Sequence, residues 1–208
     1  LGYRVNLDGT RALFDALRLA GDRPRVIYAS SIAVYGAPFP EVIPDDFHLT
    51  PKTSYGTQKL MGEALLADYA RRGFFEGVGL RFPTICVRPG RPNKAASGFF
   101  SNIIREPLAG RRAVLPVPRD VMHTHASPRS AVGFLLRAAE IDTGLLDGRP
   151  NLTMPGVGVT VGGQIDALRR IAGDHVARLI DEVPDDAIWA IVRNWPTRFE
   201  TLRARDLG

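Results

Sequence analysis

The sequence predicts an α/β fold in which helices cover a parallel sheet. Helical and strand-like segments alternate along the first half of the chain, the pattern of strand–helix–strand units. Glycine and proline follow the helical segments and mark their ends. The chain has 208 residues, 45% of them hydrophobic and 24% charged, which is enough for one sizeable domain of ordinary globular composition.

In the first half we expect helices and strands in strict alternation. Asn6 or Asp8 can cap the first helix, and Ser54 can cap the second, which ends at Gly73. A loop rich in proline and acidic residues precedes the second helix. The expected elements are a helix with Leu13, Phe14 and Leu17 on one face that ends at Gly21, a strand over Arg25–Ala29, a helix from about Tyr55 to Arg72, and a strand over Gly77–Phe82.

The second half has a less regular pattern. Its clearest element is a helix over Arg129–Ala139, in which apolar residues recur at helical spacing. These residues are Val132, Leu135, Leu136 and Ala139. The other expected elements are a helix over Gly98–Ala109, strands over Ala113–Leu115 and Asn151–Met154, a helix over Val161–Ala172, a strand over Val176–Ile180, and a helical cover after Pro184 that carries Trp189, Trp195 and Phe199.

The composition argues against several classes of protein. No run approaches the roughly 18–20 apolar residues of a membrane span. The single cysteine, Cys86, has no partner for an internal disulfide, which fits a reducing cytoplasm. The net charge is +5, but the basic residues are scattered and no nucleic-acid-binding motif occurs. We therefore expect a cytoplasmic protein without a membrane or nucleic-acid partner.

Tyr55 and Lys59 form a Tyr-x-x-x-Lys spacing at the start of a predicted helix. Residues four positions apart share a helical face, so the lysine charge is expected to lie near the phenol. That charge favours tyrosinate over tyrosine, whose unperturbed pKa is about 10, and suits the phenol to exchange a proton with an alcohol. The ammonium can also bind the ribose of a nicotinamide nucleotide. The spacing alone is common, and an exposed helical pair is the alternative interpretation.

Ser30 and Ser31 end a predicted strand about 24 residues before Tyr55. Ligands of open α/β sheets bind beyond the carboxyl ends of the strands. A serine at that position can donate a hydrogen bond to a substrate oxygen on which charge develops, although a turn or cap residue is the simpler interpretation. The order of strand, serine pair, proline-rich loop and Tyr-x-x-x-Lys helix favours Ser31, Tyr55 and Lys59 as a catalytic centre.

Longer segments resemble a known family. Residues 30–36 (SSIAVYG) and 54–59 (SYGTQK) resemble the extended short-chain dehydrogenases/reductases, the NAD-dependent epimerase/dehydratase group. Residues 6–10 (NLDGT) are similar to a helix start of that group, and residues 80–84 (LRFPT) to the segment that passes beside the nicotinamide. Residues 83–90, 92–100 and 125–129 resemble in particular the branch that oxidises D-erythronate, a small sugar acid.

The resemblance implies a Rossmann-like doubly wound parallel sheet, without its N-terminal part, and a smaller C-terminal substrate-binding region. The family's first strand and Gly-x-x-Gly-x-x-Gly turn have no counterpart here, so we expect a fragment. Residues 1–90 would belong to the NAD-binding domain, and residues 91–208 mainly to the substrate-binding region, with some elements returning to the first domain.

The resemblance also implies roles for single residues. Tyr55 would be the acid/base, Lys59 its electrostatic partner and ribose contact, and Ser31 the ligand of the reacting oxygen. The implied cofactor contacts are Asn6, Ser31, Tyr55, Lys59 and Pro83. The implied substrate contacts are Ser31, Tyr55, Thr84, Asn93, Lys94 and Ser97.

The function that we expect is oxidation of a secondary hydroxyl on a small anionic sugar acid, with NAD as cofactor and NADP as the alternative. A cationic segment suits a carboxylate substrate, but it suits a nucleotide diphosphate equally well. Its members are Arg81, Arg88, Arg91 and Lys94. A nucleotide-sugar epimerase or dehydratase is therefore the alternative function, and a non-catalytic fragment is the second alternative. Proteins that resemble this one also suggest a homodimer.

Two other patterns have simpler interpretations. Residues 156–162 (GVGVTVG) mimic a dinucleotide-binding turn, but the preceding segment contains Pro155 and the last glycine comes one position late. We predict a strand-to-helix loop there. His123 and His125 lack a thiol or carboxylate nearby in the sequence, so we predict structural histidines and no metal site.

Overall fold

The computed structural model describes residues 1–91 and 95–208 of the chain. The described residues form two compact units. The first unit comprises residues 1–83, 129–155 and 199–208, and the second comprises residues 84–128 and 156–198. Among the described residues, no helix is long and apolar enough to cross a membrane.

A parallel sheet forms the centre of the first unit. Its strands are β1 (Arg25–Ser31), β2 (Glu76–Phe82) and β6 (Asn151–Thr153), in the order β1-β2-β6. Ser31 pairs with Phe82, and Arg81 pairs with Thr153, so the strands end at the same edge of the sheet. The predicted parallel α/β arrangement is confirmed.

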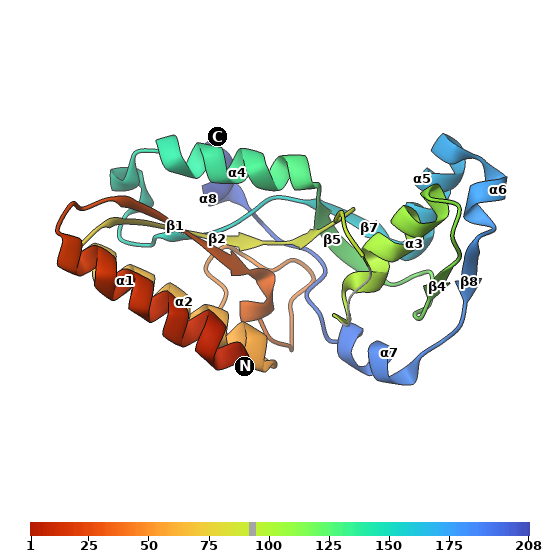
Figure 1. The fold of residues 1–208 in the computed structure, drawn as a ribbon, viewed down its shortest axis with the longest axis horizontal. Helices are drawn as coiled ribbons and strands as arrows, with labels where there is room; N and C mark the ends of the chain where they lie inside the picture. Colours follow the sequence, from red (N-terminus) through yellow and green to blue (C-terminus); the bar gives the residue numbers. More distant parts are fainter. Residues whose placement is uncertain (92–94) are drawn as a thin grey trace. The chain divides into compact units, whose positions relative to one another are not determined.

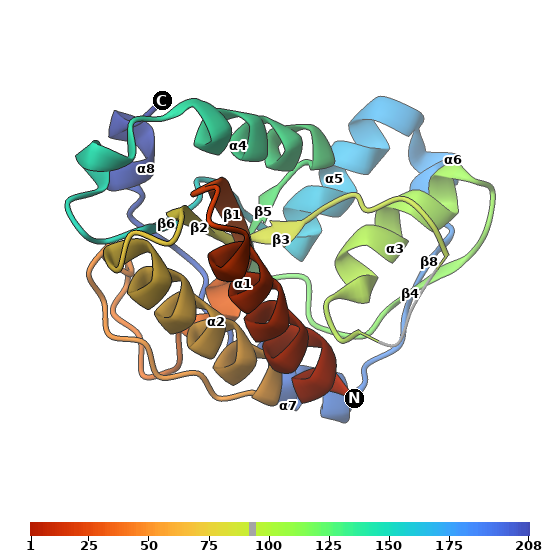
Figure 2. The ribbon, with the colours of Figure 1, turned by 60° about the vertical axis from the view of Figure 1, so that its left-hand side comes forward.

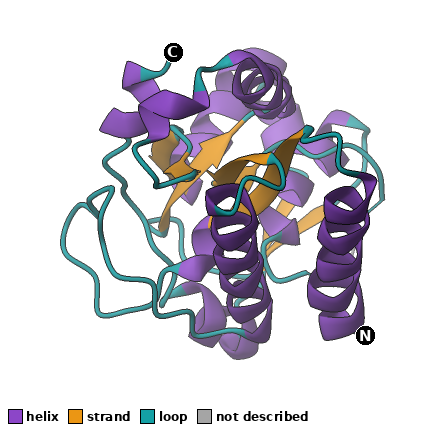
Figure 3. Cartoon of the chain, turned by 90° about the vertical axis from the view of Figure 1, so that its left-hand side faces the viewer, coloured by secondary structure: helices purple, strands orange, loops and turns teal. Residues whose placement is uncertain are grey.

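Helices cover both faces of this sheet (Figure 1). The π-helical turn η1 (Arg4–Asp8) leads directly into α1 (Gly9–Ala20), which lies beside α2 (Ser54–Arg71) on one face. Helix α4 (Pro128–Glu140) lies on the other face. Figure 3 shows the helix at the N-terminus running alongside a second long helix. The remaining elements of this unit are η2 (Ile32–Val34), η3 (Thr143–Leu146) and α8 (Leu202–Asp206).

The predicted helix caps were wrong. Asp8 already has helical backbone angles and makes no capping bond, because η1 extends the first helix toward the N-terminus through Asn6. In α2 the cap is Thr53, whose extended backbone lets its hydroxyl accept a hydrogen bond from the Gly56 N–H at 3.0 Å. Ser54 is already the first helical residue.

The predicted apolar faces were only partly correct. In α1, Phe14 is buried as expected, but Leu13 is 56% exposed. In α4 the predicted apolar stripe faces solvent, and Ala138 is buried instead. Phe134 and Ala138 pack against the sheet instead. The predicted apolar stripe lies on the opposite side of the helix and faces solvent.

The second unit is built around a mixed sheet and a strand pair. The sheet has the order β3-β5-β7, with β5 parallel to β3 and antiparallel to β7. Strands β4 and β8 pair in parallel and lie beside α3 (Figure 2). The elements are β3 (Thr84–Ile85), α3 (Gly98–Leu108), β4 (Ala113–Leu115), β5 (Met122–Ala126), β7 (Val157–Thr160), α5 (Val161–Ala172), α6 (Asp174–Ala177), β8 (Ile180–Glu182) and α7 (Asp186–Val192).

Sequence patterns misplaced or missed several of these elements. The strand predicted over Val176–Ile180 is wrong, because α6 and a turn occupy most of that segment and β8 begins only at Ile180. Residues 156–162 contain β7 and the first turn of α5, where Thr160 caps the helix by accepting from the Gly163 N–H at 3.0 Å. Strand β5 was not predicted, because its histidines and threonines do not form an apolar pattern.

Candidate active site

The two serines at the carboxyl end of β1 have different surroundings. Ser31 is the last residue of the strand, and its hydroxyl accepts a hydrogen bond from the Ala33 N–H at 3.2 Å, capping the turn η2. Ser30 is buried and donates to the Glu63 carboxylate at 2.5 Å. Successive side chains of a strand point to opposite faces, so only Ser31 remains at the edge of the sheet where a ligand would bind.

Tyr55 and Lys59 lie in the first turns of α2. The Tyr55 side chain is 47% exposed. The Lys59 ammonium donates to the Ala29 carbonyl of β1 at 2.8 Å and lies 5.7 Å from the centroid of the Tyr55 ring. Burial lowers the pKa of Lys59 from its ordinary value. The lysine charge is therefore held between the end of β1 and the exposed tyrosine.

Gly56 allows the start of α2 to approach the turn after Ser31. A Cβ atom on Gly56 would lie 2.0 Å from the Ala33 carbonyl oxygen. Because that atom belongs to the backbone, no side-chain rotation can relieve the contact. A residue without a Cβ is therefore required directly after Tyr55, a requirement that the sequence analysis missed although the glycine stands beside the tyrosine.

The aromatic ring of Tyr28 lies against the Lys59 ammonium. The Lys59 ammonium lies 5.1 Å from the centroid of the Tyr28 ring, within the range of a cation–π contact. The phenol is 8% exposed, and burial, followed by the charge of Glu63, raises its pKa to about 12. Its hydroxyl has no hydrogen-bond partner among the described residues. No sequence signal distinguishes Tyr28, because it lies within an ordinary strand pattern.

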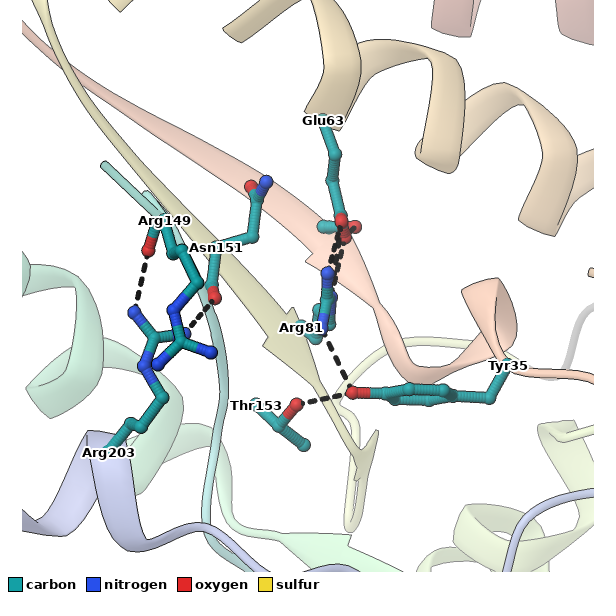
Figure 4. A network of polar contacts seen from close by, with 8 residues as sticks. Tyr35, Glu63, Arg81, Arg149, Asn151, Thr153 and Arg203 are labelled. Atoms are coloured by element: carbon teal, nitrogen blue, oxygen red, sulfur yellow. Dashed lines mark hydrogen bonds and ion pairs between the residues drawn. The ribbon is translucent and has the colours of Figure 1, made fainter. Parts of the chain in front are cut away.

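A buried ion pair lies one helical turn beyond Lys59 (Figure 4). The Arg81 guanidinium donates to the Glu63 carboxylate at 2.7 Å and to the Tyr35 hydroxyl at 3.0 Å. The Tyr35 hydroxyl also lies 2.7 Å from the Thr153 hydroxyl of β6. Burial opposes the charge on Arg81, but the hydrogen bond and charge of Glu63 outweigh it, so the pKa of Arg81 is raised.

Arg81 therefore cannot serve as a substrate cation. Its place in the sequence predicted a cation that suits a carboxylate ligand, and this expectation was wrong for Arg81. Its guanidinium lies inside the first unit and binds Glu63 and Tyr35. Neither partner is close to Arg81 in sequence, so no local pattern could have identified them.

The other predicted cofactor residues also lie in the first unit. The Asn6 side chain donates to the Gln58 side chain of α2 at 2.7 Å, which joins η1 to the helix of Tyr55 and Lys59. Pro83 is buried and directly follows β2, whose last residue pairs with Ser31. Asn6 and Pro83 thus belong to segments that flank the ends of the parallel strands.

The predicted substrate residues of the second unit have partners within that unit. The Thr84 hydroxyl lies 2.7 Å from the His123 imidazole nitrogen Nε2. The Ser97 hydroxyl accepts from the Arg88 guanidinium at 3.4 Å. Asn93 and Lys94 lie outside the described residues.

His123 and His125 are buried side chains of β5. The His123 ring stacks on Phe100 with ring centroids 5.0 Å apart. Burial, and then the neighbouring His125, lowers the pKa of His123 to about 3, and burial lowers that of His125 to about 4. Both rings are therefore neutral near pH 7. Within the described part of the chain, no group of three potential metal ligands occurs.

An apolar hollow of the first unit lies away from these residues. It has a volume of about 500 Å³ and is bordered by α4, α8 and the sheet. Its lining is mainly apolar and includes Phe134, Ile141, Met154 and Leu207. It contains none of Ser31, Tyr55 and Lys59, and its polar side chains are those of Ser130, Arg137 and Arg205, with no histidine, tyrosine, lysine or acidic side chain. The strand ends remain the better candidate for the reaction.

The family is established by comparison with known proteins. The profile of the NAD dependent epimerase/dehydratase family matches residues 2–125. The chain belongs to this family. Its Rossmann-like α/β fold is shared with a crystal structure titled as a nucleoside-diphosphate-sugar epimerase from Agrobacterium tumefaciens, with 60% sequence identity and a TM-score of 0.95. That alignment covers 99% of this chain and 61% of the other.

Two relatives are named D-erythronate dehydrogenase. The protein from Cupriavidus necator is 48% identical over all 208 residues, and that from Haemophilus influenzae is 39% identical over the same length. The chain spans 64% and 66% of their respective lengths. A monomeric L-threonine 3-dehydrogenase has a TM-score of 0.85 over 99% of this chain and 65% of its own, but at 20% identity it shows only the shared fold.

Proposed function

We propose that this chain carries the catalytic part of an NAD-dependent dehydrogenase that oxidises a secondary hydroxyl of a small sugar acid such as D-erythronate. The observation that carries the proposal is the arrangement of Lys59, which joins the end of β1 to the Tyr55 ring. The names of the two relatives at 48% and 39% identity support the choice of substrate.

The residues at the strand ends fit the nicotinamide half of such a cofactor. The Ala29 carbonyl accepts one of the three N–H bonds of the Lys59 ammonium, and the others can serve the hydroxyls of a ribose. Tyr55 is half exposed beside it. We propose Lys59, Tyr55 and Ser31 as cofactor contacts, with Asn6 and Pro83 flanking them. NAD is the proposed cofactor and NADP the alternative.

The proposed reaction separates a hydride from a proton. A bound oxidised nicotinamide would supply the acceptor for the hydride of the carbinol carbon. The Tyr55 phenolate takes the proton of the hydroxyl, and the Ser31 hydroxyl donates a hydrogen bond to the same oxygen as it becomes a carbonyl. The Lys59 charge stabilises the phenolate before the proton arrives. A carbon–oxygen double bond replaces the lost C–H and O–H bonds.

The substrate contacts of the second unit are a proposal as well. Thr84 and Ser97 supply hydroxyl groups, and we propose that they bind the hydroxyls or carboxylate of the acid together with Asn93 and Lys94. Arg88 is bonded to Ser97 and brings a positive charge to the same segment. A small anionic ligand suits these groups because a guanidinium and hydroxyls bind carboxylate oxygens well.

One specific observation favours a second candidate function. The solved structure with 60% identity is titled as a nucleoside-diphosphate-sugar epimerase. An epimerase with the same residues would remove and return the hydride on one substrate, so reduced cofactor would not accumulate. A third outcome, absence of both activities, would favour a non-catalytic chain.

We further propose a homodimer through the surface between α1 and α2. A shallow hollow there is lined by Leu7, Met61 and Leu65, with Asp8, Arg11 and Asp68 around it. Apolar residues with charges of both signs can pair with a second copy of the same surface. Met61→Asp should lower the molar mass measured by light scattering from that of a dimer to that of a monomer.

The test of the main proposal is reduction of NAD, followed at 340 nm, with the full-length protein and a panel of four-carbon sugar acids. We expect NADH formation with at least one acid and its loss in Tyr55→Phe. Conversion of nucleotide sugars without net NADH would support the epimerase instead. Tyr3→Phe is the matched control, because Tyr3 is exposed and outside the proposed centre.

A further inference from the structure

We propose that the buried Glu63–Arg81 pair positions Ser31, Tyr55 and Lys59, so that Glu63 and Arg81 are positioning residues of the active site. The kinetic test of this inference rests on the proposed function, whereas its structural basis is the geometry of the ion pair. Both side chains are almost completely buried, with Glu63 2% and Arg81 7% exposed. Neither residue contacts the proposed ligands directly.

Several network members lie close in the chain to the proposed catalytic residues. Glu63 lies four residues after Lys59 and eight after Tyr55, on the same face of α2. Ser30, which donates to Glu63, immediately precedes Ser31. Arg81 lies two residues before Pro83, at the end of β2. Ser31, Lys59 and Pro83 are therefore one to four residues from a network member, and Tyr55 is eight residues from Glu63 on the same helix.

The contacts between Arg81 and Glu63 are directional. The Arg81 Nε donates to both Glu63 oxygens at 3.0 and 3.1 Å, and Nη2 donates to Oε2 at 2.7 Å. Such a forked contact fixes the angle as well as the distance between a guanidinium and a carboxylate. It therefore fixes the position of α2 along β1 and β2, which purely apolar packing would leave less defined.

The network extends to β6 and to the turn after Ser31. Arg81 donates to the Tyr35 hydroxyl, which is paired with Thr153 (Figure 4). Tyr35 is the residue that ends η2, the turn that Ser31 caps. One guanidinium thus links the helix of Tyr55 and Lys59 to the turn that follows Ser31.

The test replaces the pair without leaving a buried charge. In the full-length protein, Glu63→Met combined with Arg81→Met should fold, because apolar residues of similar volume often replace a buried ion pair without loss of stability. We expect kcat to fall about 100-fold with little change in the KM for either substrate, since a displacement of about 1 Å can have that effect. Leu146→Ala, a buried substitution in η3 outside the network, is the control for lost stability.

Two further measurements keep the inference testable. A crystal structure of the double variant should show the mutual distances of the Ser31 hydroxyl, Tyr55 hydroxyl and Lys59 ammonium changed by more than about 0.5 Å, the tolerance of a preorganised site. Ser30→Ala, which removes only one link, should lower kcat by a smaller factor. If the double variant keeps the wild-type distances among these three groups, the inference is overturned, whatever its kcat.

The outcomes distinguish this inference from the proposed function. If the wild-type protein reduces no NAD with any sugar acid, the proposed function fails, and the crystallographic comparison alone decides whether the pair positions the three residues. If the wild type is active and the double variant retains its geometry, only the positioning role is rejected. A Glu63→Asp/Arg81→Lys variant should recover part of kcat if directional bonds matter.

Discussion

The Lys59 ammonium and the Ala29 carbonyl are joined by a hydrogen bond of 2.8 Å, which ties the first turns of α2 to the strand that ends in Ser31. The bond holds the lysine charge beside Tyr55. In this position the ammonium loses part of its hydration, and this burial lowers the pKa of Lys59. The lysine therefore acts both as a structural link and as the charge that the proposed reaction requires.

Lys59→Met should reduce the proposed dehydrogenase activity of the full-length protein. The variant keeps the length of the side chain but removes the charge that stabilises the Tyr55 phenolate. We expect kcat to fall by about 10²- to 10⁴-fold, the usual contribution of acid–base catalysis, and the remaining activity to rise toward alkaline pH. A pH series of initial rates measures both effects. Unchanged kcat in a folded Lys59→Met protein would contradict the proposed role.

Gly56→Ala should impair activity more than the small size of the change suggests. The new Cβ would meet the Ala33 carbonyl oxygen at 2.0 Å, so α2 and the turn after Ser31 must separate. We expect a fall in kcat of about 100-fold, because small displacements of reacting groups are costly.

Gly133→Ala is the matched control for this substitution. Gly133 lies within α4, and a Cβ there meets no atom within 4 Å. Alanine is a better helix former than glycine, so this variant should be more stable by up to about 1 kcal/mol and fully active. Comparison of the two variants by thermal unfolding and by initial rates separates the steric effect from the general effect of adding a methyl group.

Tyr28 offers a test of how the lysine is supported. Tyr28→Phe keeps the ring 5.1 Å from the Lys59 ammonium and removes a buried hydroxyl that has no partner among the described residues. The variant should be as stable as the wild type or more stable, with activity within about twofold, because an unpaired buried hydroxyl is unfavourable. Tyr28→Leu, which removes the aromatic ring, should lower kcat. Urea unfolding and initial rates provide the two measurements.

The sequence predicted those parts of the molecule that depend on short-range patterns. The strand that ends in Ser31 and the helix of Tyr55 and Lys59 follow from local periodicity and from the i to i+4 spacing. The Glu63–Arg81 pair was missed because its members lie 18 positions apart and a buried arginine looks the same in sequence as one that binds a substrate. Folding alone brings these residues together.

Two other errors have the same origin. The stripe of Val132, Leu135 and Leu136 has the expected helical period, yet α4 buries Ala138 instead, because the shape of the sheet beneath the helix selects the buried face. Strand β5 was missed because His123 and His125 are buried as neutral side chains. A pattern of hydrophobic residues cannot reveal polar residues that the fold accommodates in its interior.

The buried histidines of β5 predict a loss of stability in acid. Their pKa values are lowered to about 3 and about 4 in the folded chain, while an exposed histidine has a pKa near 6.5. Between about pH 6.5 and pH 4, the unfolded chain therefore binds protons on these side chains that the folded chain does not. Above this window the contribution of the two histidines to the free energy of unfolding is constant. As the pH falls through the window, the free energy of unfolding decreases by up to about 1.4 kcal/mol per pH unit for each histidine.

Urea unfolding at a series of pH values, followed by fluorescence of Trp189 and Trp195, measures this slope in the second unit. Both tryptophans pack against the core of that unit, so their emission reports its unfolding. His125→Asn removes one titrating group and should make the dependence on pH less steep, and His175→Asn, at an exposed position, is the control for the substitution itself. An unchanged slope in His125→Asn would show that His125 is not a source of the acid sensitivity, because a side chain that does not titrate cannot contribute to the difference in proton binding.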